Sequence, residues 1–284
     1  RVLPGLARPG AATLRTVRYN PARRWVGVVE RGEQTALLRA YRTDDTSRHA
    51  RAYAALQGRG SPTPRLLGLS RRYGTAAVEW VPGRELTAAA DPAERFAAAG
   101  AALAELHLAS PAHLQPISAP AQATAVRAAG RQIGVLRPDL ASQATRFGDL
   151  AAARIQRLEP VRTVVHGDFS ADQVVRGTDG RVTLIDLDSA GIGDPAIDLG
   201  CAAAALECES DVSAGHLIEA MQSGYATVQP LPSEDRLAVY TAAHLLRRAG
   251  EAFRSRDADW AQQMRRLLDR AEDELASARR GTPR

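Results

Sequence analysis

Residues 164–188 constrain the fold more than any other part of the chain, because they predict a loop followed by a tight β-hairpin. The runs "VVR" and "VTLID" flank the turn sequence "GTDG", as in a hairpin with a glycine-containing turn. Gln173 precedes the first strand and Asp186 ends the second, so antiparallel pairing brings these side chains together. Asp168 lies in the loop just before the first strand. Three oxygen-bearing side chains are therefore expected at the open end of one hairpin.

These oxygen atoms favour a particular chemistry. Carboxylate and amide oxygens from Asp168, Gln173, Asp186 and Asp188 suit Mg²⁺ better than Zn²⁺. The order of the segment is His166-Gly167-Asp168, four residues, an amide, and then an Asp on a strand, which is the order found in phosphoryl-transfer enzymes. In the simpler interpretation, Asp168 and Asp172 cap turns and His166 packs. The downstream Asp186 and the sequence "GDPAID" favour the catalytic interpretation.

The remaining pattern predicts an α+β fold in two parts. Residues 13–42 contain "TLRTVRY", "WVGVVE" and "TALLRAYR", which predict a three-stranded antiparallel meander. A helix over 44–60, an extended segment "SPTPRLLGLS" and a strand over 73–81 complete an N-terminal domain, residues 1–81. The second domain, residues 82–284, is predicted to be mostly helical, and its expected segments are helices at 92–110 and 123–159, a loop at 111–122, the hairpin, and helix from about 196 onward.

Composition narrows the function classes. The chain is 45% hydrophobic and 24% charged, and no window approaches the roughly 18 apolar residues of a membrane helix. The first residues lack a signal-peptide core, so we expect a soluble cytoplasmic protein with no membrane partner. Cys201 and Cys208 are spaced too far along a predicted helix to bond, which agrees with a reducing compartment.

All cationic side chains other than histidine are arginine, because the chain contains no lysine among its 37 Lys+Arg residues. Any cationic work on a phosphate must therefore be done by arginine. Residues 1–100 hold 17 arginines against 8 acidic residues, which suits an anionic ligand such as a nucleotide phosphate. We expect no nucleic-acid partner, since no stripe of arginine and aromatic residues appears.

The residues "HGDFSADQVV…LIDLDSAGIGDPAIDLG" resemble the aminoglycoside phosphotransferase and choline kinase-like superfamily of small-molecule kinases. The segments "SPTPRLLG", "VEWVPGREL" and "GAALAELH" resemble landmarks of that family in their usual order, and the resemblance covers roughly residues 35–205. It implies a protein-kinase-like bilobal fold, with a small antiparallel β-sheet and one helix in the N-lobe and a larger helical C-lobe.

The resemblance also implies roles for individual residues. Asp168 would be the catalytic base, and His166 would orient the catalytic loop. Mg²⁺ would be held by Gln173 and Asp186, with Asp188 as a further oxygen donor. Asp198 would hold the loop through backbone hydrogen bonds. ATP would bind between the lobes, with its adenine at the linker formed by Glu79, Trp80 and Val81; whether GTP replaces ATP is left open.

Three departures from the family pattern concern the amide of the metal site, the cation of the third strand with its helical partner, and the loop between the first two strands. Gln173 stands where Asn is usual, and it keeps an amide oxygen on a longer side chain. Arg39 stands in the third strand where a phosphate-binding Lys is expected, and it can pair with phosphate bidentately or be a plain surface residue. His49 replaces the helical Glu that would pair with that cation, with Asp44 or Asp45 as possible compensation. No Gly-rich loop separates the first two strands, where Arg23 and Arg24 either touch phosphates or form a solvated turn.

Two functions follow from these features. The first is phosphorylation of a small-molecule hydroxyl by Mg·ATP, with an aminoglycoside or other antibiotic, a sugar or an amino alcohol as acceptor. The alternative is a nucleotide-binding pseudokinase or regulatory module without turnover. A protein kinase is disfavoured, since no activation segment separates "IDLD" from "GDPAID". An acceptor that carries amines would be bound by acidic side chains of the C-lobe. The acidic clusters in that part of the sequence are Glu207/Glu209/Asp211, Glu234/Asp235 and Asp257/Asp259. The sequence does not indicate the oligomeric state.

Overall fold

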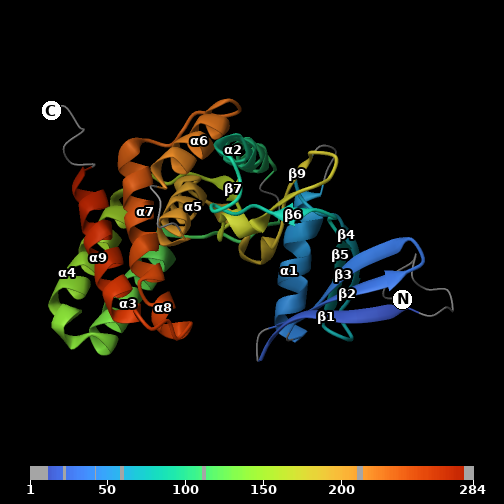
Figure 1. Ribbon diagram of the computed structural model, residues 1–284, viewed down its shortest axis with the longest axis horizontal. Coiled ribbons are helices and arrows are strands. Elements are labelled where there is room, and N and C mark those ends of the chain that lie inside the picture. The colour runs from blue at the N-terminus through green and yellow to red at the C-terminus, as the bar shows by residue number, and fades with distance from the viewer. Residues whose placement is uncertain are drawn as a thin grey trace.

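The computed structural model describes residues 12–21, 24–41, 43–57, 61–110, 113–209 and 214–277, with the side chains of residues 43–48 left aside. Figure 1 shows a small β-sheet with one helix at one end of the molecule and a larger helical body at the other. The yellow hairpin lies between these two parts. This arrangement confirms the predicted α+β fold with a sheet-containing N-lobe and a helical C-lobe.

The N-lobe is built on a five-stranded antiparallel sheet with strand order β1-β2-β3-β5-β4. The strands are β1 (Thr13–Asn20), β2 (Arg24–Arg31), β3 (Gln34–Tyr41), β4 (Leu66–Ser70) and β5 (Thr75–Glu79). The predicted meander is confirmed, since β1 pairs with β2 and β2 with β3 in antiparallel register. The segment expected to be a mere extended exit at 61–70 also contains β4, which pairs with β5.

Helix α1 (Thr43–Leu56) packs between this sheet and the C-lobe. It ends four residues earlier than the predicted 44–60 helix. Gly58 and Gly60, the glycines expected to end the helix, lie outside the described residues. Its buried Tyr53 and Leu56 share a hydrophobic cluster with Val78 of β5 and with Leu184 and Leu187 of the C-lobe. The backbone N–H of Leu184 also donates to the carbonyl of Pro62 at 2.6 Å. The two lobes are thus held together by apolar packing as well as by polar contacts.

The predicted hairpin is confirmed as β8 (Val174–Arg176) and β9 (Val182–Leu184), which pair antiparallel. A third strand, β6 (Arg84–Glu85), pairs with β8 just after the sheet of the N-lobe ends. Two further strands, β7 (Thr163–Val165) and β10 (Gly191–Gly193), pair with each other on either side of this segment. The domain boundary near residue 82 stays a prediction.

The C-lobe helices are α2 (Ala93–His107), α3 (Ala119–Leu136), α4 (Ala141–Arg157), α5 (Ala196–Glu209), α6 (Gly215–Ala226), α7 (Glu234–Arg248), α8 (Glu251–Arg254) and α9 (Trp260–Ser277). The predicted loop over 111–122 is too long, because α3 begins at Ala119. Ser118 caps that helix by accepting from Ala121 N, and Pro120 fits its first turn. The predicted helix over 123–159 is interrupted by a 3₁₀ turn (Pro138–Leu140), since proline cannot continue the hydrogen-bond ladder.

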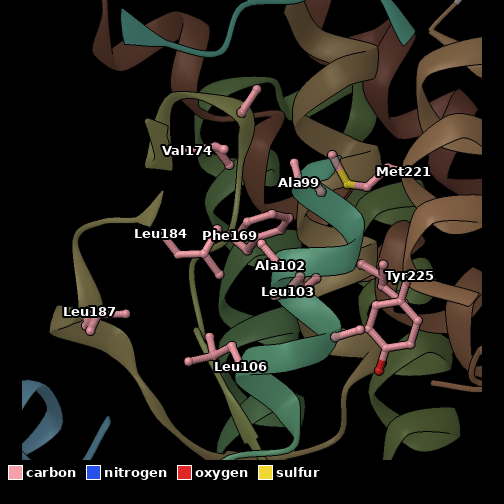
Figure 2. Close-up of a cluster of buried hydrophobic side chains, with 14 of the residues drawn as sticks. Ala99, Ala102, Leu103, Leu106, Phe169, Val174, Leu184, Leu187, Met221 and Tyr225 are labelled. Carbon is pink, nitrogen blue, oxygen red and sulfur yellow. The ribbon is translucent and has the colours of Figure 1, made fainter. Parts of the chain in front are cut away.

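The catalytic-loop segment rests on the hydrophobic core that surrounds α2. Figure 2 shows Phe169 pointing toward Ala102 and Leu103 of α2, with Leu184 of the hairpin beside it. Phe169 is fully buried. Burying an aromatic side chain of this size stabilises the fold by about 1.5–3 kcal/mol. The residue that follows Asp168 therefore anchors the loop to the rigid part of the C-lobe.

A second hydrophobic core joins α3, α4, α7 and α9. Helix α7 also carries the buried His244, whose titration should affect stability. Burial, together with the charges of Arg247 and Arg248, lowers the pKa of His244 well below its usual value. The unfolded chain therefore binds a proton below about pH 6.5 that the folded protein excludes. Stability should fall with decreasing pH below that point, by up to about 1.4 kcal/mol per pH unit from this group.

The measurement is the free energy of urea unfolding between pH 5 and 7 for wild type and His244→Gln. The variant should show a shallower fall toward pH 5 than wild type. Identical slopes in the two proteins would show that His244 does not exclude its proton.

In the part of the chain that the structure describes, no helix combines the length and apolarity needed to cross a membrane.

Candidate active site

Asp168 lies in the loop that leads from β7 to the hairpin, and its side chain is exposed. Its Oδ1 atom lies 4.0 Å from the thiol Sγ of Cys201, a buried residue of α5. Burial raises the pKa of the Cys201 thiol to about 12, so the thiol stays neutral beside the carboxylate. No arginine of the described residues forms an ion pair with Asp168. The carboxylate is thus free to accept a proton from a ligand.

The backbone of this loop is held by Asp198, which is fully buried at the start of α5. The N–H of His166 donates to Asp198 Oδ2 at 2.6 Å, and the N–H of Gly167 donates to Oδ1 at 2.7 Å. His107 Nε2 lies 3.0 Å from the same Oδ2 atom, and its Nδ1 lies 2.9 Å from the hydroxyl of Tyr225. The backbone role expected of Asp198 is what the structure shows, and it fixes the position of Asp168.

His166 faces inward and its side chain is buried. Its Nε2 donates to the carbonyl of Ile185 at 2.8 Å, and its ring lies edge-on to Phe169. Its Nδ1 is buried without a hydrogen-bond partner. The ring therefore ties the loop to the strand that delivers Asp186, and it does not line the large pocket described next.

Gly167 adopts a left-handed backbone conformation with φ of +82°. A Cβ atom there would lie 2.3 Å from the carbonyl oxygen of Ser189, a contact that forces the backbone to move. Gly180, in the hairpin turn, has almost the same φ of +81°, but a Cβ there meets nothing within 4 Å. Substitution of Gly180 would therefore introduce conformational strain alone, whereas substitution of Gly167 would add a steric clash.

We expect Gly180→Ala to cost about 1–2 kcal/mol of unfolding free energy, from the left-handed conformation alone. Gly167→Ala should cost clearly more, because the clash with Ser189 adds to that strain. Urea unfolding of both variants measures the difference. Equal losses would mean that the loop accommodates the Cβ without displacing the Ser189 carbonyl.

The hairpin brings together the residues that the sequence predicted to meet. The N–H of Ile185 donates to the carbonyl of Gln173 at 2.8 Å, so Asp186 emerges next to Gln173. Asp168, Gln173, Asp186 and Asp188 all line one pocket of about 810 Å³. Asp186 holds a left-handed conformation with φ of 61° and ψ of 52°, which is unusual for a residue with a Cβ and is typical of functional sites.

Two arginines from the N-lobe bind the carboxylates of Asp186 and Asp188. Arg39, with a side chain 6% exposed, places Nη1 2.8 Å from Asp186 Oδ1 and 2.9 Å from Asp188 Oδ1. Arg24 donates to both oxygens of Asp186, at 3.0 and 2.7 Å, and also contacts Asp188. Burial alone would raise the pKa of Asp186, but the charges and hydrogen bonds of the two arginines hold it well below its usual value. Both lobes therefore meet through a compact cluster of two cations and two anions.

Aromatic side chains surround this cluster. The hydroxyl of Tyr41 donates to Asp188 Oδ1 at 2.8 Å, and His49 stacks on the Tyr41 ring with centroids 4.4 Å apart. His49 Nδ1 lies 3.1 Å from the backbone carbonyl of Asp188. His49 thus does not take the place of a glutamate partner for Arg39. The side chains of Asp44 and Asp45, named as compensating acids, lie outside the described residues.

Oxygen donors are the ligands that magnesium prefers, and this pocket contains several of them. Gln173 donates its Nε2 to Asp172 at 2.9 Å, which leaves its amide oxygen available as a ligand beside Asp186 and Asp188. The described residues contain no group of three or more His, Cys, Asp or Glu side chains arranged to hold a metal, so the amide would be needed to complete the set. The guanidinium groups on both carboxylates show that this position already favours positive charge.

The linker residues Glu79, Trp80 and Val81 line a separate pocket of about 240 Å³ between the lobes. The carboxylate of Glu79 is engaged by Arg65 on the protein surface, at 3.1 Å. Trp80 is 37% exposed. Thr183 of the hairpin and Pro64 before β4 complete this side of the pocket. The three linker residues are therefore not among those that line the large pocket with Asp168.

Two arginines that line the large pocket, Arg24 from the N-lobe and Arg248 from the C-lobe, were not assigned their contacts from the sequence. Arg24 was expected either to touch phosphates or to lie in a solvated turn, and no role was expected of Arg248, at the end of α7. Both lie far along the chain from the residues they approach, 162 residues from Asp186 in the case of Arg24 and 47 from Cys201 in the case of Arg248. No local pattern marks contacts of that separation.

A family model described as the phosphotransferase enzyme family matches residues 18–231, which is most of the chain. The chain belongs to the phosphotransferase enzyme family. This confirms the resemblance seen in the sequence and makes the chain a small-molecule kinase. None of the curated proteins matches the chain significantly.

Solved structures of phosphotransferases share the fold. Choline kinase LicA from Streptococcus pneumoniae is 15% identical over 96% of this chain and 95% of its own, with a TM-score of 0.67. The amicoumacin kinase hAmiN, solved in complex with AMP-PNP, Ca²⁺ and Ami, is 14% identical over 92% of this chain and 88% of its own, with a TM-score of 0.68. Aminoglycoside phosphotransferase APH(4)-Ia, solved with ADP and hygromycin B, is 14% identical over 96% and 95%, with a TM-score of 0.67. At these identities, the likeness shows that this chain has the same fold as the three kinases.

Proposed function

We propose that this phosphotransferase moves the γ-phosphoryl group of ATP to a hydroxyl of a small molecule, with Asp168 as the base. The observation that supports it best is that Asp168, Gln173, Asp186 and Asp188 line one pocket, in which Asp186 and Asp188 pair with arginines while Asp168 forms no ion pair among the described residues. A carboxylate without such a partner can accept a proton, whereas the charges of Asp186 and Asp188 are neutralised by the arginines that bind them. The complexes of hAmiN with AMP-PNP and of APH(4)-Ia with ADP favour an adenine nucleotide here also.

The chain's residues divide the reaction between them. Asp168 orients the acceptor hydroxyl and takes its proton as the oxygen forms a bond to the γ-phosphorus and the bond to the leaving ADP breaks. Asp198 and His166 hold the loop so that this carboxylate keeps its position. Gln173, Asp186 and Asp188 would hold Mg²⁺, which when bound neutralises phosphate charge. Glu79, Trp80 and Val81 are proposed to contact the adenine.

Arg24 and Arg39 are proposed to bind the phosphates. Both guanidinium groups already lie at the Asp186 carboxylate, and each has donors beyond those that the carboxylates use. Arg39 Nε is buried without a hydrogen-bond partner, which marks unused donor capacity at this position. Guanidinium groups bind phosphate oxygens in bidentate fashion, so these residues would do the work of the absent lysine and Gly-rich loop.

A nucleotide-binding module without turnover is the second candidate. It is favoured by the contacts of Arg24 with Asp186 and Asp188, since these carboxylates are the proposed metal ligands. For catalysis, at least the Arg24 contacts must be exchanged for contacts to the metal and phosphates.

Steady-state ATP turnover with a panel of hydroxyl compounds distinguishes the two candidates. The panel should contain aminoglycosides, sugars, amino alcohols and hydroxy acids, with and without Mg²⁺, and a parallel thermal-shift titration should report nucleotide binding. Acceptor-dependent turnover that requires Mg²⁺ supports the kinase. Nucleotide binding without turnover on any acceptor supports the module.

A further inference from the structure

The C-lobe side of the large pocket contains an arginine that the phosphoryl-transfer machinery described above does not use. Arg248 is the last residue of α7, and its side chain is 20% exposed. It lines the same pocket as Asp168, together with Arg254, Glu209, Glu251 and Asp172. Taking a guanidinium group largely out of water is costly unless a ligand or a partner satisfies it.

The partners of Arg248 among the described residues are weak. Its Nη2 lies 4.0 Å from the Sγ of Cys201, which is a neutral and poor acceptor. Its Nη1 lies 3.3 Å from Glu251, a half-exposed side chain that also faces Arg254 at 3.6 Å. By contrast, the half-buried Arg270 contacts Glu207 at 2.7 Å, and the buried Arg39 contacts Asp186 at 2.8 Å. Arg248 therefore keeps donors of its planar guanidinium for a ligand in the pocket.

Arg248 is close to the reacting centre. The Sγ of Cys201 lies 4.0 Å from Asp168 Oδ1 and 4.0 Å from Arg248 Nη2, so no more than twice that distance separates the carboxylate from the guanidinium. A short carbon chain spans this separation. One small molecule can therefore present a hydroxyl to Asp168 and an acidic group to Arg248 at the same time.

We propose that Arg248 is a specificity residue which binds a carboxylate of the acceptor, so that the substrate class is the hydroxy acids, including hydroxy amino acids. This inference rests on the proposed function, since it places the acceptor hydroxyl at Asp168. The acidic side chains Glu209 and Asp172, which line the same pocket, favour an acceptor that also carries an amine. The carboxylate takes no part in bond making; the hydroxyl oxygen bonds to the γ-phosphorus, its proton goes to Asp168, and ADP leaves.

The first arm of the test measures binding without turnover. L-serine and L-homoserine are each compared with their amides, which keep the hydroxyl and the amine but lose the carboxylate. Thermal shifts are recorded with Mg²⁺ and AMP-PNP at saturation, so that the arginines of the nucleotide side are occupied. The proteins are wild type, Arg248→Gln, Arg248→Lys and Arg247→Gln, since Arg247 is the exposed neighbour on α7 and does not line the pocket.

The acids should stabilise wild type and Arg247→Gln more than the amides do. That difference should vanish in Arg248→Gln and be partly restored in Arg248→Lys, which keeps the charge but not the bidentate geometry. In the second arm, steady-state transfer to the acids should show KM raised at least about tenfold in Arg248→Gln, while transfer to the amides is unchanged. A purely structural role would lower stability and the activity on both acceptor types alike.

Two outcomes separate this inference from the function on which it rests. If acids and amides bind and react equally in wild type and in Arg248→Gln, or if neither acid binds, Arg248 is not a carboxylate site. Phosphorylation of other acceptors would in that case still support the proposed kinase function. If acids bind through Arg248 but no compound is phosphorylated, the anion site stands and the proposed function fails.

Discussion

Asp168→Asn should lower kcat for phosphoryl transfer by about 10²–10⁴-fold, with little change in nucleotide affinity. The substitution keeps the size of the side chain but removes the ability to accept the hydroxyl proton. Asp168 is exposed in its loop and forms no ion pair with any residue that the structure describes, so the fold should tolerate the change. The check is steady-state transfer by wild type and variant, with nucleotide affinity measured separately.

Asp273→Asn is a matched control, since Asp273 is exposed on α9 and lines neither the large pocket nor the pocket of the linker residues. This control should keep wild-type kcat. Full activity in Asp168→Asn would remove Asp168 from the role of base.

Asp198→Ala should lower the free energy of unfolding by about 3–5 kcal/mol, because it breaks a fully buried polar network. The backbone N–H groups of His166 and Gly167 would lose their acceptor, and His107 would lose its partner. The catalytic loop should then lose its fixed geometry, so activity should fall together with stability. Urea unfolding monitored by circular dichroism gives the energy, and steady-state transfer gives the activity.

Asp149→Ala provides the comparison, since Asp149 is 62% exposed and pairs loosely with Arg127 at 3.3 Å. Its cost should stay within about 0.5 kcal/mol. If Asp198→Ala were as harmless as Asp149→Ala, the loop would have to be held by other contacts.

The sequence predicted the site where the relevant geometry is local. A hairpin with only residues 177–181 between its strands fixes its own register, so Gln173 and Asp186 could be placed together from spacing alone. The strands of the N-terminal meander follow from β-branched and apolar runs between short turns. The start of α3 was missed although its signal is local, because Ser118 and Pro120 were read as loop residues and not as a cap and a first turn.

Contacts between the lobes could not be predicted from spacing. Arg24, at the start of β2, meets Asp186 only because of the way the two lobes dock. The stacking of His49 on Tyr41 likewise requires α1 to lie against the sheet. Arg248 reaches the pocket from the end of α7, whose position is set by packing in a separate core. In each case the partner is chosen by tertiary packing, which leaves no periodic pattern in the chain.

The most direct test of the central claim follows the γ-phosphoryl group itself. The protein is incubated with Mg²⁺ and ATP labelled with ¹⁸O at the γ-phosphoryl group, together with the acceptor panel, and the products are read by mass spectrometry. The account predicts labelled phosphoryl attached to an acceptor hydroxyl in wild type and its loss in Asp168→Asn. Labelled phosphate released only to water, or labelled ATP left intact with every acceptor, would contradict it.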